Sequence, residues 1–302
     1  MWTQIQYALI YGWIKLHALL PMSALYVLSD FLYFIVYRVI RYRVSVVRRN
    51  LKAAFPGKSN KELLLLEKKF YHHFADYVVE TLKLAHISLE ELQKRAYVQN
   101  PELIDQLMDK GNPCCLLLMG HFGNWEWYSG STSRFKDACL YQIYRPLNNK
   151  AVDKLFIHLR TKFGSFGIPK NDTGREVVRL VRNKVRSAVI FLADQTPSPS
   201  NLHYWTNFLN QDTAILTGAE RLARKLNTPV VFLDVQMLER GYYTLEIQLI
   251  TDNPKETPEN WITEEYARRM EKSILRKPEG WLWTHKRWKY KRSDAVTHHG
   301  NN

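Results

Sequence analysis

Short apolar runs place the strongest constraint on the fold of this chain. Four runs of six mostly apolar residues cover 114–119, 139–144, 187–192 and 230–235. Such runs are long enough for buried strands, whereas a helix usually needs ~10–12 residues. Because helical patterns separate the runs, the sequence predicts an α/β fold whose central, mostly parallel sheet is flanked by helices.

The remaining elements follow from periodicity and from helix start and stop signals. An alternating run at 243–250 predicts an antiparallel strand. Ser59 and Glu62 form the pattern of a capping box, which predicts a helix that starts there. The expected helices cover 59–83, 88–95, 100–110, 125–135, 149–163, 174–184, 214–226 and 259–277.

The end of the run 114–119 carries the first candidate for chemistry. Gly120 and His121 follow it, and Glu126 lies five residues after the histidine. On one helix such positions point about 140° apart, so they meet only if His121 lies in a turn before the helix. A carboxylate behind an imidazole fixes its tautomer and raises its basicity, so that it can take a proton from an alcohol. The alternative is a strand-end histidine bonded to a backbone carbonyl.

Polar residues also follow two other predicted strands. Arg145 comes after 139–144 and would suit a phosphate or a developing oxyanion. Asp194 and Gln195 come after 187–192, at the edge of the sheet where α/β proteins place their sites. Asn124 is suited to capping the helix after His121. We assign these four residues to substrate or oxyanion binding; the alternative for Arg145, Asp194 and Gln195 is a solvated loop position.

The first 40 residues predict a membrane-associated segment. Residues 5–40 are mostly apolar, and 22–39 is just long enough to span the ~30 Å hydrocarbon layer if Asp30 is tolerated. Basic residues follow without an acid before Glu62, which is typical of the positive-inside rule or of a helix on anionic lipid. The expected membrane contacts here are Arg38, Arg41, Arg48 and Arg49. The alternative is a buried helix hairpin with a solvated basic end.

We therefore expect three parts: a membrane-associated helical hairpin or anchor at 1–45, an α/β domain at 46–292 and a polar tail at 293–302. A cleavable signal peptide is not expected, because the start of the chain lacks a basic region. The hydropathy pattern leaves a single span and a helix lying on the surface both open.

The charge of the chain predicts a polyanionic partner. The formal net charge is +14, and residues 281–292 interleave three tryptophans and a tyrosine with five basic residues. Bases of nucleic acid could stack on such a stretch, but aromatic and basic residues together also mark a membrane interface. The apolar N-terminus favours the membrane, so we expect membrane contacts at Lys286, Arg287 and Trp288 and no nucleic acid. The alternative is a helix packed on the core.

Several kinds of chemistry lack their sequence patterns. The three cysteines fit no zinc spacing and are expected to be reduced core residues, and neither HxxxH nor HExxH occurs. The chain has no GxxxxGK[ST], GxGxxG or GxSxG motif. We therefore expect no metal and no cofactor, and any acyl transfer would be direct, with a general base and no acyl-serine intermediate.

The segment from Gly120 to Glu126, GHFGNWE, resembles the HxxxxE motif of the bacterial lipid A biosynthesis (lauroyl/myristoyl-type) acyltransferases, within the lysophospholipid acyltransferase superfamily. Further similar segments are RNL at 49–51 with FP at 55–56, YRPLNN at 144–149, ADQ at 193–195 and WTHKRWK at 283–289. The resemblance covers roughly residues 5–290. The stretch 196–209 departs from the family's usual pattern, which leaves acyl-chain and acceptor specificity open.

This resemblance implies an O-acyltransferase on the cytoplasmic side of the inner membrane. It would move a fatty acyl chain from acyl carrier protein, the donor substrate and partner, to a hydroxyl of a lipid A precursor, the glycolipid part of lipopolysaccharide. His121 would be the general base and Glu126 its orienting partner. The alternatives are an aminolipid or lysophospholipid acyltransferase and, outside enzymes, a basic membrane- or nucleic-acid-binding protein.

Overall fold

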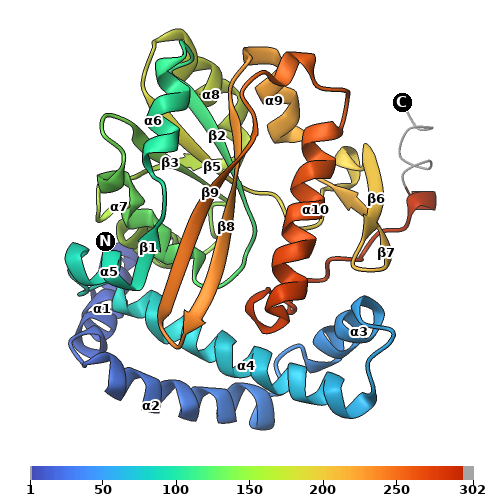
Figure 1. Cartoon of the computed structure of the whole chain (residues 1–302). Helices are drawn as coiled ribbons and strands as arrows, with labels where there is room; N and C mark the ends of the chain where they lie inside the picture. Colours follow the sequence, from blue (N-terminus) through green and yellow to red (C-terminus); the bar gives the residue numbers. More distant parts are fainter. Residues whose placement is uncertain (1, 295–302) are drawn as a thin grey trace.

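A seven-stranded sheet forms the centre of the computed structural model, which describes residues 2–294 (Figure 1). The strands run in the order β1-β9-β8-β2-β5-β3-β4, and every neighbouring pair is parallel except β8 and β9. Their bounds are β1 (Ala96–Val98), β2 (Cys114–Met119), β3 (Cys139–Tyr144), β4 (Phe166–Pro169), β5 (Ser187–Leu192), β8 (Val230–Glu239) and β9 (Tyr242–Thr251). The predicted α/β fold with a mostly parallel sheet is confirmed.

The helices lie on both sides of this sheet, with α6 and α7 on one side and α9 and α10 on the other (Figure 1). Every residue of β2 is buried, which explains its continuous apolar sequence. Cys114 and Cys115 belong to this buried strand, and all three cysteines are free. After the N-terminal helices, the α-helices are α4 (Asn60–Lys83), α5 (Leu89–Arg95), α6 (Glu102–Asp109), α7 (Lys150–Thr161), α8 (Thr173–Arg182), α9 (Gly218–Leu226) and α10 (Trp261–Arg276).

One expected helix is partly wrong. The helix expected over 214–226 begins only at Gly218, because residues before it form the second strand of a hairpin, β6 (Tyr204–Phe208) and β7 (Gln211–Ile215). Leu209 and Asn210 make its two-residue turn with φ of 50° and 61°, the left-handed values that a tight hairpin of this kind requires. The hairpin is separate from the main sheet.

The apolar N-terminus forms helices that cover α4. They are α1 (Trp2–Ala18), α2 (Met22–Tyr33), which continues into the π-helical segment η1 (Phe34–Val39), and α3 (Val44–Ala54). Together, α2 and η1 are 18 residues long and apolar enough to cross a bilayer, and only 22% of these residues are buried. Figure 1 shows α2 lying alongside α4.

Polar contacts attach this apolar stretch to α4. The Ser29 hydroxyl donates to Asp76 at 2.6 Å, and the Tyr37 hydroxyl donates to Glu67 at 2.7 Å. The opposite face remains open. Its exposed apolar side chains include Val27, Phe31, Phe34, Val39 and Ile40, with Trp2, Leu9, Trp13 and Leu16 on α1. Of the expected tail at 293–302, residues 295–302 lie outside the described part of the chain.

Candidate active site

The register of two neighbouring strands brings His121 to Asp194. Strands β2 and β5 pair in parallel, with Met119 opposite Leu192 at their carboxyl ends. The histidine and the aspartate each lie two residues beyond these partners. They therefore leave the same edge of the sheet side by side, at the place where α/β folds bind ligands.

Two hydrogen bonds join these residues. The backbone N–H of His121 donates to one carboxylate oxygen of Asp194 at 2.9 Å, and Nδ1 lies 2.7 Å from the other. On the opposite side of the ring, Nε2 lies 3.2 Å from the amide nitrogen of Gln195. Because an amide nitrogen only donates, this arrangement fits the tautomer with its proton on Nδ1 and a lone pair on Nε2. A histidine in this state can accept a proton at Nε2.

The Asp194 carboxylate is built to stay ionised although it is only 4% exposed. Burial alone would raise its pKa, but His121 and the indole N–H of Trp281, which donates to it at 2.8 Å, bring the pKa down to about 2. Hydrogen bonds to the charged form of a carboxyl group lower its pKa in this way. Asp194 therefore provides a fixed negative charge behind the imidazole.

The predicted contact between His121 and Glu126 is not present. Glu126 lies in η2 (Trp125–Arg134) and accepts two hydrogen bonds from Arg160 of α7, at 2.6 and 2.7 Å. Its side chain is 4% exposed, so this two-point pair supplies the counter-charge that a buried carboxylate needs. The carboxylate that orients the imidazole in this structure is therefore Asp194, and Glu126 instead lines the pocket beside it.

Asn124 also lies elsewhere than predicted. Its side chain is fully buried and its amide N–H donates to Glu80 of α4 at 2.9 Å. It is not among the residues that line the pocket at His121, and its Oδ1, the atom that would cap η2, accepts no hydrogen bond from the described residues. This position does not fit a contact with substrate, so Asn124 holds the loop from behind.

A pocket of about 400 Å³ opens next to the imidazole. Arg145 and Gln195, which the sequence predicts to lie near His121, line this pocket. Glu126 and Arg160 line it as well. The rest of its wall is largely apolar and includes Met119, Trp125, Ile143, Phe156, Ile157, Ile190, Leu192 and Leu282. An imidazole at one wall and an apolar interior fit a reaction on a molecule that carries a hydrocarbon chain.

Sequence comparison agrees with this geometry. A model of the bacterial lipid A biosynthesis acyltransferases matches residues 2–290. The chain belongs to this family. It is therefore an acyltransferase, and the family resemblance that the HxxxxE segment indicated is confirmed. A search of curated proteins found no match.

In this acyltransferase the aromatic and basic stretch near the C-terminus is largely part of the core. Trp281 and Trp283 are 2% and 0% exposed, and Arg287 is buried and donates to the carbonyl oxygen of Ala214 at 2.6 Å. The prediction that Arg287 contacts the membrane is therefore wrong. Trp288 is half-buried and donates to Thr213, whereas Lys286 is exposed. Aromatic rings seated in the core cannot stack on nucleic acid.

The N-terminal basic segment has two roles in the acyltransferase fold. Arg38, Arg41 and Arg49 are exposed, and Arg48 is half-exposed and paired with Glu67 at 2.8 Å. Asn50, in contrast, is buried and donates to the carbonyl oxygens of Trp283 and His285, both at 2.9 Å. Helix α3 thus fixes the segment that places Trp281 on Asp194.

Sequence reasoning missed three residues of this site in their actual roles: Asp194 as the partner of the histidine, Arg160 and Trp281. One signal for Asp194 was present. The runs 114–119 and 187–192 are equally long and are followed by Gly-His and Ala-Asp, so pairing them as parallel neighbours places His121 next to Asp194. Arg160 lies on a helix among other basic residues, and its sequence carried no comparable signal.

Proposed function

We propose that this acyltransferase moves a fatty acyl chain from acyl carrier protein to a hydroxyl of a lipid A precursor or a related glycolipid. The observation that carries this proposal is the pairing of His121 with Asp194 at the wall of an apolar pocket. The pocket suits an acyl chain, the imidazole suits removal of a proton from a hydroxyl, and the family supplies the reaction class.

In the proposed reaction, His121 acts as the general base. Its Nε2 takes the proton of the acceptor hydroxyl while the hydroxyl oxygen attacks the thioester carbonyl carbon, and Nδ1 stays bonded to Asp194. The contact between Nε2 and Gln195 is given up when the hydroxyl binds. The tetrahedral intermediate then expels the thiolate, which takes the proton from the imidazolium, so that an ester and a free thiol result.

Arg145 is the proposed electrostatic partner of the substrate. It follows β3, lies in the same pocket wall as His121 and forms no ion pair among the described residues. A guanidinium in this place can stabilise a substrate phosphate or the oxyanion of the intermediate. Loss of one oxyanion donor typically lowers kcat by ~10²–10³.

The proposed location of the enzyme is the cytoplasmic face of the inner membrane. The apolar side chains of α1, α2 and η1 face outward, and the exposed Arg38, Arg41 and Arg49 follow them directly. A helix with an apolar face beside basic residues binds an anionic lipid surface. Because α2 is attached to α4 by side-chain bonds, we infer that it lies on the bilayer rather than crossing it.

The alternative acceptors are an aminolipid or a lysophospholipid. Mass spectrometry of lipids from a strain that lacks the protein separates these candidates. Loss of one acyl chain from lipid A, restored by the wild-type gene but not by His121→Ala, supports the proposal. An unchanged lipid A with a deficit in another lipid class would reassign the acceptor. Labelled acyl carrier protein and acyl-coenzyme A, supplied separately to membranes, identify the donor.

A further inference from the structure

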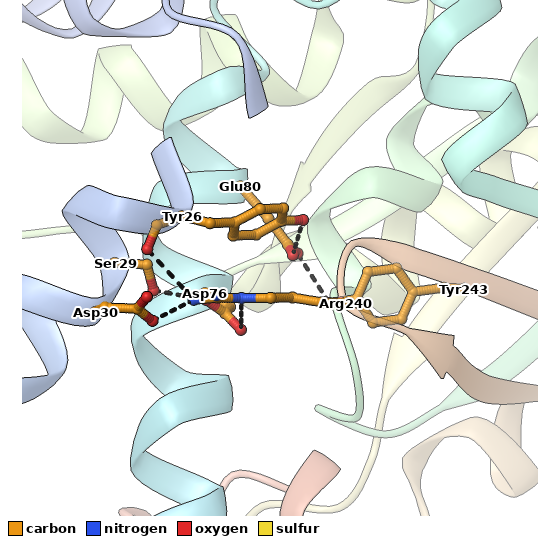
Figure 2. Close-up of polar contacts among 7 residues, drawn as sticks. All are labelled: Tyr26, Ser29, Asp30, Asp76, Glu80, Arg240 and Tyr243. Atoms are coloured by element: carbon orange, nitrogen blue, oxygen red, sulfur yellow. Dashed lines mark hydrogen bonds and ion pairs between the residues drawn. The ribbon is translucent and has the colours of Figure 1, made fainter. Parts of the chain in front are cut away.

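Glu80 joins three parts of the fold in the interior of the protein. It lies on α4, is fully buried and accepts hydrogen bonds from three side chains, of which Figure 2 shows Tyr26 and Tyr243. Tyr26 of α2 donates to one carboxylate oxygen at 3.1 Å, and Asn124 and Tyr243 donate to the other at 2.9 and 2.8 Å. Figure 2 shows Tyr26 and Tyr243 approaching Glu80 from opposite sides.

Two of the groups bonded to Glu80 belong to the His121 loop, which we define as residues 120–127. Besides the side chain of Asn124, the indole N–H of Trp127 donates to the backbone carbonyl oxygen of Glu80 at 2.8 Å. These two residues lie on either side of Glu126 and just after His121 in the chain. Glu80 therefore fixes the part of the loop that carries the pocket residues His121 and Glu126.

A second set of contacts fixes the position of Tyr26. Arg240, at the turn between β8 and β9, bonds to Asp76 of α4 at 2.6 Å and to Asp30 of α2 at 2.6 Å. The Arg240 guanidinium also lies 4.4 Å from the centre of the Tyr26 ring. Helix α2 is thus held against α4 in the register that delivers the Tyr26 hydroxyl to Glu80 (Figure 2).

A carboxyl group destabilises the fold at this buried position, so packing alone does not explain why it is there. No cation is hydrogen-bonded to Glu80 among the described residues, because Arg240 is bonded to Asp76 and Asp30 instead. Burial raises the pKa of Glu80 to about 7, so the charged form is costly here. Its two oxygens, however, can accept from α2, from β9 and from the loop at the same time, which a single hydroxyl or amide oxygen cannot do as well.

We propose that Glu80 is a positioning residue for acyl transfer, and that it couples the seating of the apolar helix α2 to the geometry of the His121 loop. The inference rests on the proposed function of His121. The exposed face of α2 is apolar, so a lipid surface can bind it. Lipid bound there would hold α2 in place and thereby preserve the hydrogen bond from Tyr26 to Glu80. A displaced α2 would release one of the contacts that hold the loop.

Two tyrosines of the same apolar stretch provide a matched pair of variants. Tyr26→Phe removes the hydroxyl that reaches Glu80, and Tyr37→Phe removes a hydroxyl that reaches another α4 carboxylate, Glu67. Glu67 is bonded to Arg48 as well, and neither partner belongs to the His121 loop. We expect Tyr26→Phe to lower kcat about tenfold with little change in KM, since small displacements of catalytic groups have large effects on rate. Tyr37→Phe should stay within about twofold of the wild type.

A second pair tests Glu80 itself, with kcat and KM measured per folded enzyme. Glu80→Ala should lower kcat by at least about tenfold. Glu80→Gln keeps an acceptor for a tyrosine and gains a donor for the otherwise unpaired Asn124 Oδ1. Its kcat should therefore be close to that of the wild type. Equal kcat in wild type, Tyr26→Phe and Glu80→Ala, with an inactive His121→Ala, overturns the inference and leaves the proposed function standing. An active His121→Ala overturns the proposed function instead.

Discussion

His121 and Asp194 are bonded at 2.7 Å although 73 positions separate them in the chain. Their meeting depends on the parallel register of β2 and β5, not on any local motif. The nearer carboxylate in sequence, Glu126, is bonded to Arg160. The site therefore contains two buried carboxylates with different partners, and each can be tested by itself.

Asp194→Asn should lower kcat by ~10²–10⁴ with a small effect on KM, because the imidazole loses the acceptor that fixes its tautomer. The control is Asp234→Asn, which also changes a carboxylate that is 4% exposed but bonded to Ser273 and Arg276 of α10 instead of to a histidine. Its kcat per folded enzyme should match that of the wild type. Steady-state kinetics with labelled acyl carrier protein checks both, and a wild-type kcat in Asp194→Asn contradicts the assignment.

Arg160→Met should reduce the free energy of unfolding by about 3–5 kcal/mol, because it leaves the buried Glu126 carboxylate without its counter-charge. The double variant Glu126→Gln/Arg160→Met should regain part of this loss. Arg175→Met, which breaks an exposed ion pair with Asp172, should change it by less than about 1 kcal/mol. Denaturant unfolding in detergent measures all three. Equal effects in Arg160→Met and Arg175→Met would show that the Glu126 pair is not a buried one.

The pKa of Glu80 predicts a pH-dependent stability. Its folded-state pKa is about 7, chiefly because of burial, whereas the ordinary value is 4.5. The folded protein thus keeps a proton that the unfolded chain releases, so stability from this group is present below pH 4.5 and is lost as the pH rises through 7. Tyr26, Tyr243 and Asn124 face the carboxyl group, and Asp76 lies on the same helix one turn away.

Glu80→Gln cannot titrate, so its Tm relative to the wild type should rise between pH 5 and pH 8. The full shift corresponds to roughly 3 kcal/mol, or several degrees for a chain of this size. Thermal unfolding in detergent at a series of pH values measures this difference. A Tm difference that does not change over this range contradicts a titrating Glu80.

Basic residues next to the apolar helices should control binding to anionic lipid. Arg41→Gln/Arg49→Gln should weaken binding to vesicles that contain an anionic phospholipid by about 2 kcal/mol, or about 30-fold, at low salt. The control Arg182→Gln/Lys225→Gln changes two exposed charges on α8 and α9, at the end of the molecule opposite α2 (Figure 1). Sedimentation with vesicles is the measurement, and equal losses in both double variants would show a general charge effect without a defined membrane face.

Much of the sheet could be predicted from the sequence because its central strands are short apolar runs, and the strand 114–119 is buried throughout. The runs at 114–119, 139–144 and 187–192 coincide with β2, β3 and β5. β1 has three residues and β4 contains a glycine and a proline, so neither forms an apolar run. The hairpin of β6 and β7 was missed, and the end of β7, residues 214–215, was assigned to the start of a helix.

The site was predicted only in part, since its residues meet through tertiary structure. The sequence places His121, Arg145 and Gln195 at strand ends, and the pocket contains all three. The pairing of β2 with β5 was not deduced, so the nearest carboxylate in sequence, Glu126, was assigned to the histidine. The prediction for the C-terminal tryptophans was wrong for another reason. Composition alone does not distinguish a ring buried in a core from one at a membrane surface.

The rate of acyl transfer by His121→Ala tests the central claim most directly. Membranes that contain equal amounts of wild type or variant are incubated with labelled acyl carrier protein and a lipid A precursor, and the labelled lipid is quantified by mass spectrometry. The variant should be bound to the membrane and folded to the wild-type extent, with a rate at least ~10²-fold lower, because it lacks the imidazole that takes the proton of the acceptor hydroxyl. A rate near that of the wild type would contradict the account.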